Sequence, residues 1–100
     1  MNIDATGNAP NSIRIAVIDD HPLFREGTVV VLTNANGIEV VGEGATASDA
    51  VAIAREHIPD VMLLDLYLPG GGIEAAASIA RAWPNVRIVA PPAIFFRVTA

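Results

Sequence analysis

The chain has 100 residues, of which 52% are hydrophobic and 17% are charged; this excludes a disordered chain and predicts one domain with a small core. The net charge is −5 and all six basic residues are scattered arginines, so we expect no nucleic-acid binding through this chain. There is no Cys, no signal peptide at the start and no apolar run long enough to span a bilayer, which together favour a cytoplasmic protein without a disulfide framework or membrane contact.

The first elements alternate between strand and helix patterns. Residues 1–12 are small and polar and predict a flexible N-terminal extension. The run 13–18 is β-branched and almost wholly apolar, which is typical of a strand buried on both faces. Pro22 suits the first position of a helix that we expect to reach about Thr33, and a turn over 34–37 follows.

The middle of the chain repeats this alternation. Residues 38–43 mix charged and apolar side chains and predict an edge strand. Thr46 and Asp49 have the spacing of a capping box, and the helical spacing of apolar residues after them predicts a helix that Pro59 ends. The apolar run 61–64 predicts a second fully buried strand.

A glycine-rich loop over 68–72 separates this strand from a third helix, which we expect to end near Trp83. The apolar side chains expected on one face of that helix are Ile73, Ala76, Ala77 and Ala80. Residues 86–90 predict a fourth strand. Strands and helices in strict alternation, with short connections, predict a parallel α/β sheet with right-handed crossovers.

Acidic residues follow two of the buried strands. Asp19 and Asp20 come directly after the first, and Asp65 comes directly after the third. If these strands are neighbours, the three carboxylates converge at the carboxyl edge of the sheet. Two unit charges 4 Å apart repel by about 4 kcal/mol at an effective dielectric of 20, so such a group calls for a cation, and its hard oxygen ligands favour Mg²⁺. The alternative, that Asp19 and Asp20 only cap the next helix, is less consistent with two acidic strand ends.

Three other side chains invite a functional interpretation. His21 follows the acidic pair, and we interpret it as a helix-entry residue rather than a metal ligand. His57 lies late in the second helix, where a cation suits the helix dipole, and we assign it no catalytic role. The side chain of Tyr67 is expected to point to solvent.

Two segments resemble receiver domains of two-component response regulators. Residues 15–27 read IAVIDDHPLFREG and are similar to the opening of CheY-like receivers in the branch that usually carries a LuxR-type helix-turn-helix output domain. Residues 59–70 read PDVMLLDLYLPG and resemble the phosphorylation segment of that family. The match extends over about 13–89, and it implies a flavodoxin-like fold, a parallel sheet with helices on both faces.

The resemblance also implies roles for the acidic residues. Asp65 would be the phosphoacceptor, phosphorylated by a histidine kinase or a small phosphodonor. Mg²⁺ would be the cofactor, held by Asp19, Asp20, Asp65 and the backbone carbonyl of Tyr67. Such an ion neutralises charge as an anionic phosphoryl group approaches an anionic carboxylate.

The resemblance ends after Val89. The family places a Thr or Ser after its fourth strand, where this chain has Ala90, and it uses a Lys, of which these 100 residues contain none. We therefore expect residues 13–90 to form a C-terminally truncated receiver, with four strands, three helices and impaired switching. Residues 91–100 include apolar and polar side chains in alternation and predict an atypical strand-like tail that pairs two chains as a homodimer.

Two functions remain open. The first is a signalling receiver, which accepts a phosphoryl group without being an enzyme for a separate substrate. The second is a pseudo-receiver that dimerises or binds other proteins without being phosphorylated. The three acids favour the first, whereas the absent hydroxyl and Lys favour the second.

Overall fold

The computed structural model describes residues 11–91. Its elements, in chain order, are β1 (Ile13–Ile18), α1 (Pro22–Thr33), β2 (Ile38–Gly44), α2 (Ala47–His57), β3 (Val61–Leu64), α3 (Gly72–Ala82) and β4 (Arg87–Val89). The predicted strands and helices are all confirmed, with ends that differ by two residues at most. The predicted extension, apart from residues 11 and 12, and the predicted dimerisation tail, apart from Pro91, lie outside the described residues.

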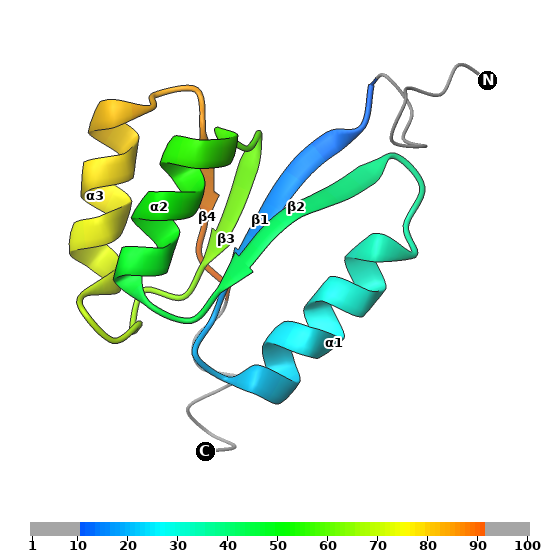
Figure 1. Ribbon diagram of the computed structural model, residues 1–100, viewed down its shortest axis with the longest axis horizontal. Coiled ribbons are helices and arrows are strands. Elements are labelled where there is room, and N and C mark those ends of the chain that lie inside the picture. The colour runs from blue at the N-terminus through cyan, green and yellow to red at the C-terminus, as the bar shows by residue number, and fades with distance from the viewer. Residues whose placement is uncertain (1–10, 92–100) are drawn as a thin grey trace.

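The four strands form one parallel sheet in the order β2-β1-β3-β4. The two strands that precede the acids, β1 and β3, are therefore central neighbours, and β2 lies at an edge as predicted. Figure 1 shows α2 and α3 on one face of this sheet and α1 on the other. This arrangement confirms the predicted flavodoxin-like parallel sheet with helices on both faces. None of the helices in residues 11–91 is long and apolar enough to cross a membrane.

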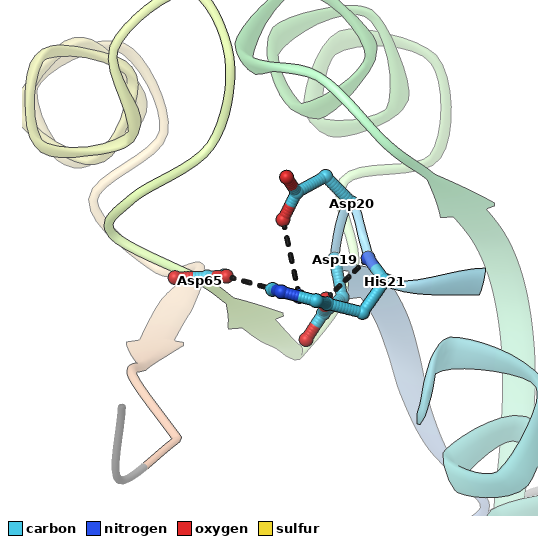
Figure 2. Close-up of side chains that lie close together, drawn as sticks. All are labelled: Asp19, Asp20, His21 and Asp65. Carbon is cyan, nitrogen blue, oxygen red and sulfur yellow. Dashed lines mark hydrogen bonds and ion pairs between the residues drawn. The ribbon is translucent and has the colours of Figure 1, made fainter. Parts of the chain in front are cut away.

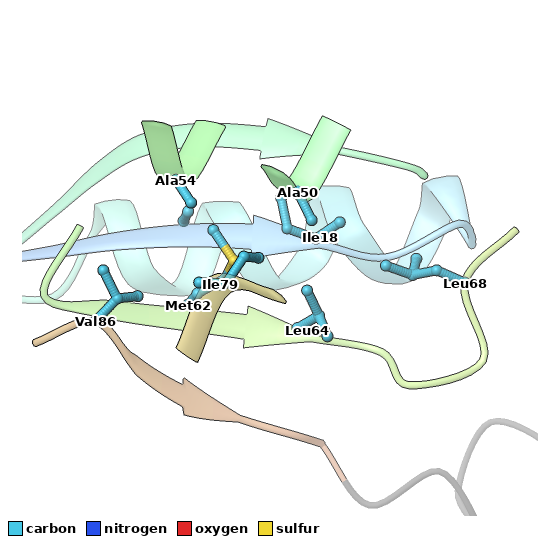
Figure 3. Close-up of a cluster of buried hydrophobic side chains, with 9 residues drawn as sticks. Ile18, Ala50, Ala54, Met62, Leu64, Leu68, Ile79 and Val86 are labelled. Atoms are coloured by element: carbon cyan, nitrogen blue, oxygen red, sulfur yellow. The ribbon is translucent and has the colours of Figure 1, made fainter. Parts of the chain in front are cut away.

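The core lies between the sheet and the pair α2 and α3. Alternate residues of β1 and β3 point to this side, and alanines of α2 allow that helix to approach the strands closely (Figure 3). The buried members are Ala16, Ile18, Ala50, Ala54, Met62, Leu64, Leu68, Ile79 and Val86. Full burial of each large apolar side chain contributes roughly 1.5–3 kcal/mol, so this layer holds the two central strands side by side.

The face of α3 that packs on the core differs from the prediction. The structure buries Gly72, Ala75 and Ile79. Of the expected face, Ala76 is half-buried and the other three residues are exposed, namely Ile73, Ala77 and Ala80. The prediction was wrong because small apolar residues occupy most positions of this helix, so that spacing alone allows two faces. Packing selects the face on which Gly72 fits against the backbone carbonyls of Asp65 and Leu66.

The start of α2 is tied to the segment that follows β3. The predicted capping box is present, because Thr46 Oγ1 accepts the Asp49 N–H at 3.1 Å and Asp49 Oδ2 accepts the Thr46 N–H at 3.2 Å. The next backbone N–H, of Ala47, donates to the carbonyl of Pro69 at 3.0 Å. The helix end and the loop after Asp65 thus support one another.

Candidate metal centre

Backbone hydrogen bonds place the predicted acids at one edge of the sheet. The N–H of Asp19 donates to the Gly44 carbonyl at 3.0 Å, and the N–H of Asp65 donates to the Ile18 carbonyl at 3.1 Å. Each bond continues the parallel ladder one step beyond a strand end. The side chains of Asp19 and Asp65 therefore project from adjacent strand ends, as the sequence predicted.

The three acids lie together with a histidine. Asp19, Asp20, His21 and Asp65 each offer one ligand atom, and these atoms all lie within 4.8 Å of one another (Figure 2). Asp19 and Asp65 are almost fully buried, with exposed fractions of 2% and 3%, whereas Asp20 and His21 are partly exposed. The site thus combines two carboxylates that are held away from water with two further side chains, a carboxylate and an imidazole, that solvent can reach.

Local turns fix both buried carboxylates. Asp65 Oδ1 accepts the backbone N–H of Tyr67 at 2.9 Å, in the manner of an Asx turn. Asp19 Oδ1 accepts the backbone N–H of His21 at 2.8 Å in the same way. The side chain of Tyr67 is 62% exposed, which confirms that it points to solvent.

Two buried carboxylate oxygens in this site need a positive partner. Asp19 Oδ2 and Asp20 Oδ1 accept no hydrogen bond from any described residue. A buried acceptor without a partner costs about 1–3 kcal/mol, and more when it is charged. A divalent cation would satisfy both oxygens, and a set of carboxylate oxygens suits Mg²⁺. The residues present therefore fit a metal ion.

The capping alternative receives less support. The N-cap residue of α1 is His21, and its side chain makes no capping hydrogen bond. A capping carboxylate normally accepts an N–H from the first turn of the helix. The carboxylate of Asp19 instead accepts the N–H of His21, the N-cap residue itself, which comes before that turn. The two acids therefore point to the sheet edge and not to the start of the helix.

Sequence reasoning missed two residues of the site. His21 does enter the helix as predicted, yet its ring turns towards the carboxylates, and Nδ1 lies 2.8 Å from Asp19 Oδ1. Arg25 donates from Nη1 to the backbone carbonyl of Asp19 at 2.7 Å, and its Nε lies 3.4 Å from Glu43 Oε1. Their positions close to the acidic pair, one and five residues after Asp20, were the available signal.

A fourth position at this edge belongs to β4. Val89 pairs with Leu63 in the parallel ladder, so Ala90, the first residue after β4, lies level with Leu64, one residue before Asp65. Its side chain is a single methyl group. It offers no hydroxyl to the site.

The fold and this acidic site define a receiver domain. The family model for the response regulator receiver domain matches residues 15–92, and the chain belongs to this family. It is thus similar to proteins of two-component signal transduction.

Individual relatives agree with this assignment. Response regulator GacA of Pseudomonas aeruginosa is 40% identical over 78 residues, which cover 77% of this chain and 36% of GacA. The crystal structure of a LuxR-family response regulator from Aurantimonas has a TM-score of 0.73 and 41% identity, covering 79% of this chain and 57% of that one. RcsB from Salmonella enterica, bound to promoter rprA in the presence of the phosphomimetic BeF3⁻, has a TM-score of 0.73 and 26% identity, covering 80% of this chain and 42% of that one. The chain spans little more than a third of the length of the curated relatives that it matches.

Proposed function

We propose that this chain is a receiver domain in which Asp65 accepts a phosphoryl group with the help of Mg²⁺. The donor would be a histidine kinase or a small phosphodonor. The observation that carries this proposal is the position of the Asp65 carboxylate, buried beside Asp19 and Asp20, which each have an oxygen without a hydrogen-bond partner.

Each acid has a distinct task in this proposal. The Tyr67 N–H donates to Oδ1 of Asp65 at 2.9 Å, and we assign Oδ2 as the nucleophile. As Oδ2 bonds to phosphorus, the bond between phosphorus and the donor breaks and the donor leaves with its electron pair. Asp19 and Asp20, with the carbonyl of Tyr67, would hold the ion. Bound Mg²⁺ supplies positive charge where two anionic groups approach each other.

We expect phosphorylation of Asp65 to produce little conformational switching. Ala90 stands at the carboxyl end of β4, where the family provides a hydroxyl that contacts the phosphoryl group. A methyl group cannot donate a hydrogen bond to a phosphoryl oxygen. Ala90 also favours the second candidate function, a pseudo-receiver that binds partners without being phosphorylated.

One experiment separates the two functions. The protein is incubated with acetyl phosphate, with and without Mg²⁺, and the product is analysed by intact mass and peptide mapping. We expect one added phosphoryl group at Asp65 only when Mg²⁺ is present, and none in Asp65→Asn or Asp20→Asn. Glu56→Gln changes an exposed acid of α2 outside the site and serves as the matched control. A wild-type protein that binds Mg²⁺ but stays unmodified would establish the pseudo-receiver instead.

The same samples test the switch. Hydrogen exchange of β4 and α3 is compared with and without the phosphomimetic BeF3⁻ at saturating Mg²⁺. We expect protection to increase around Asp65 and to remain unchanged in β4. A widespread change in β4 would contradict impaired switching.

A further inference from the structure

His21 places an imidazole nitrogen among the carboxylates. Its Nδ1 lies 2.8 Å from Asp19 Oδ1, 3.2 Å from Asp20 Oδ1 and 3.9 Å from Asp65 Oδ2 (Figure 2). The backbone holds this residue on both sides, because its N–H donates to Asp19 Oδ1 at 2.8 Å and its carbonyl accepts the Arg25 N–H at 2.9 Å. These bonds fix the backbone of His21, and the hydrogen bond between Nδ1 and Asp19 Oδ1 orients the ring towards the carboxylates.

The spacing of these atoms is that of ligands around one ion. Bonds from a small divalent cation to oxygen or nitrogen are about 2.1 Å long, so two ligands at right angles lie about 3 Å apart. The separations of 2.8 and 3.2 Å between Nδ1 and the oxygens of Asp19 and Asp20 are close to this value. Nδ1 can thus serve the same ion as the carboxylates.

The histidine alone does not satisfy the carboxylates around it. A ring nitrogen carries at most one hydrogen, and in the structure Nδ1 makes its hydrogen bond to Asp19 Oδ1. A ligating imidazole nitrogen carries no hydrogen, so a bound ion would take the place of this hydrogen bond. Asp20 Oδ1 lies 3.2 Å from Nδ1 but makes no hydrogen bond. The second oxygen of the buried Asp19, Oδ2, also makes no hydrogen bond. Asp19 Oδ2, which takes no part in the contacts of Nδ1, points independently to a cation.

We infer that His21 is a direct metal ligand and that it shifts the preference of this site from Mg²⁺ towards Zn²⁺. The inference rests on the metal site of the proposed function and adds a ligand to it. Mg²⁺ binds oxygen ligands and water, whereas Zn²⁺ binds imidazole nitrogen and carboxylate oxygen and imposes no geometry of its own. Three carboxylates and one imidazole therefore form a set in which Zn²⁺ benefits from the nitrogen more than Mg²⁺ does.

The test compares the affinities of the two metals by isothermal titration calorimetry in a buffer that binds neither. His21→Gln is expected to weaken Zn²⁺ binding by at least about 10–100-fold, because the loss of an outer-shell partner of a metal ligand already costs that much. It is expected to change Mg²⁺ binding by less than about threefold. His21→Cys is expected to retain the preference for Zn²⁺, because a thiolate also binds Zn²⁺ in preference to Mg²⁺. Circular dichroism of the metal-free variants verifies that each is folded.

The other histidine of the chain supplies the matched control. His57→Gln removes the same side chain from the end of α2, and the backbone carbonyl that accepts a hydrogen bond from Arg14 is retained. Both metals should bind this variant as they bind the wild type. A ratio of Zn²⁺ to Mg²⁺ affinity that His21→Gln leaves unchanged, or that His57→Gln lowers equally, would overturn the inference.

Asp20→Asn separates this inference from the proposed function. It is expected to weaken the binding of both metals, since its carboxylate belongs to the site whichever ion is present. If it alters neither, the proposed metal site is wrong. If it weakens both while His21→Gln changes the two affinities by the same factor, the site stands and only the role of His21 is refuted.

Discussion

Gly72, the first residue of α3, offers the sharpest test of how the fold positions the site. A Cβ added there would lie 2.5 Å from the carbonyl carbon and oxygen of Leu66 and 2.6 Å from the carbonyl oxygen of Asp65. These are backbone atoms of the segment that leaves β3, and no side-chain rotation can move them away. Gly72→Ala must therefore displace either α3 or the segment that carries Asp65.

The size of the effect follows from these distances. Real Cβ contacts essentially never fall below 3.0 Å, so a contact of 2.5 Å must open by at least 0.5 Å. Overpacking of this kind costs about 1–3 kcal/mol, and the better helix propensity of Ala returns up to about 1 kcal/mol. We expect a net loss of about 1–2 kcal/mol in the free energy of unfolding, together with weaker Mg²⁺ binding because the site acids are displaced.

The control is the same substitution in α1. A Cβ at Gly27 would meet nothing within 4 Å, so Gly27→Ala should stabilise the protein by about 0.5–1 kcal/mol and leave Mg²⁺ binding unchanged. Urea unfolding, with and without Mg²⁺, measures both effects. If Gly72→Ala proved as stable as the wild type and bound Mg²⁺ equally well, the close contact between α3 and the Asp65 segment would be refuted.

Three further substitutions test the framework around the site. Thr46→Ala removes the acceptor of the Asp49 N–H at the start of α2 and should cost about 1 kcal/mol in urea unfolding; an unchanged midpoint would contradict the capping box. The backbone N–H of Ala45 and the capping Thr46 hold the pKa of Asp49 below its usual range. The carboxylate therefore stabilises the fold at neutral pH, and this contribution is lost as the pH falls through the folded-state pKa. Below about pH 4, the urea midpoint of Asp49→Asn should decline less steeply than that of the wild type. Arg14→Met removes hydrogen bonds of 2.8 and 3.2 Å to carbonyls at the end of α2 and should lower thermal stability by about 1 kcal/mol, whereas equal melting temperatures would show that water replaces the guanidinium without loss.

The sheet and most of the site could be predicted because the deciding signals are local. Runs 13–18 and 61–64 are short and mainly apolar, which favours strands covered on both faces, and each stops abruptly at an aspartate. Once both runs are parallel strands, their carboxyl ends must share an edge of the sheet. The meeting of Asp19 and Asp65 then depends only on whether the strands are neighbours, which the order β2-β1-β3-β4 confirms.

The remaining features depend on packing that no short segment of sequence encodes. The buried face of α3 is set by the fit of Gly72 against the carbonyls of Asp65 and Leu66, which are distant from most of the helix in sequence. The direction of the His21 ring depends on the turn over Asp19 to His21. Arg25 holds this turn, because its backbone N–H donates to the His21 carbonyl and its Nη1 donates to the Asp19 carbonyl. Residue type allowed either orientation for this ring, since a histidine before Pro22 can equally face solvent.

The position of each residue in the sheet separates metal binding from signal readout. The acids extend from β1 and β3, each of which pairs with strands on both sides, so ladder bonds and the core hold them from several directions. Ala90 follows β4, a three-residue strand that pairs within the described sheet only with β3. The proposed ion binding and phosphoryl transfer would thus depend on the most constrained part of the fold. The position that would contact the phosphoryl group follows the least constrained strand and has only a methyl group. For this reason, we expect the proposed phosphorylation of Asp65 to occur in this chain with little conformational response.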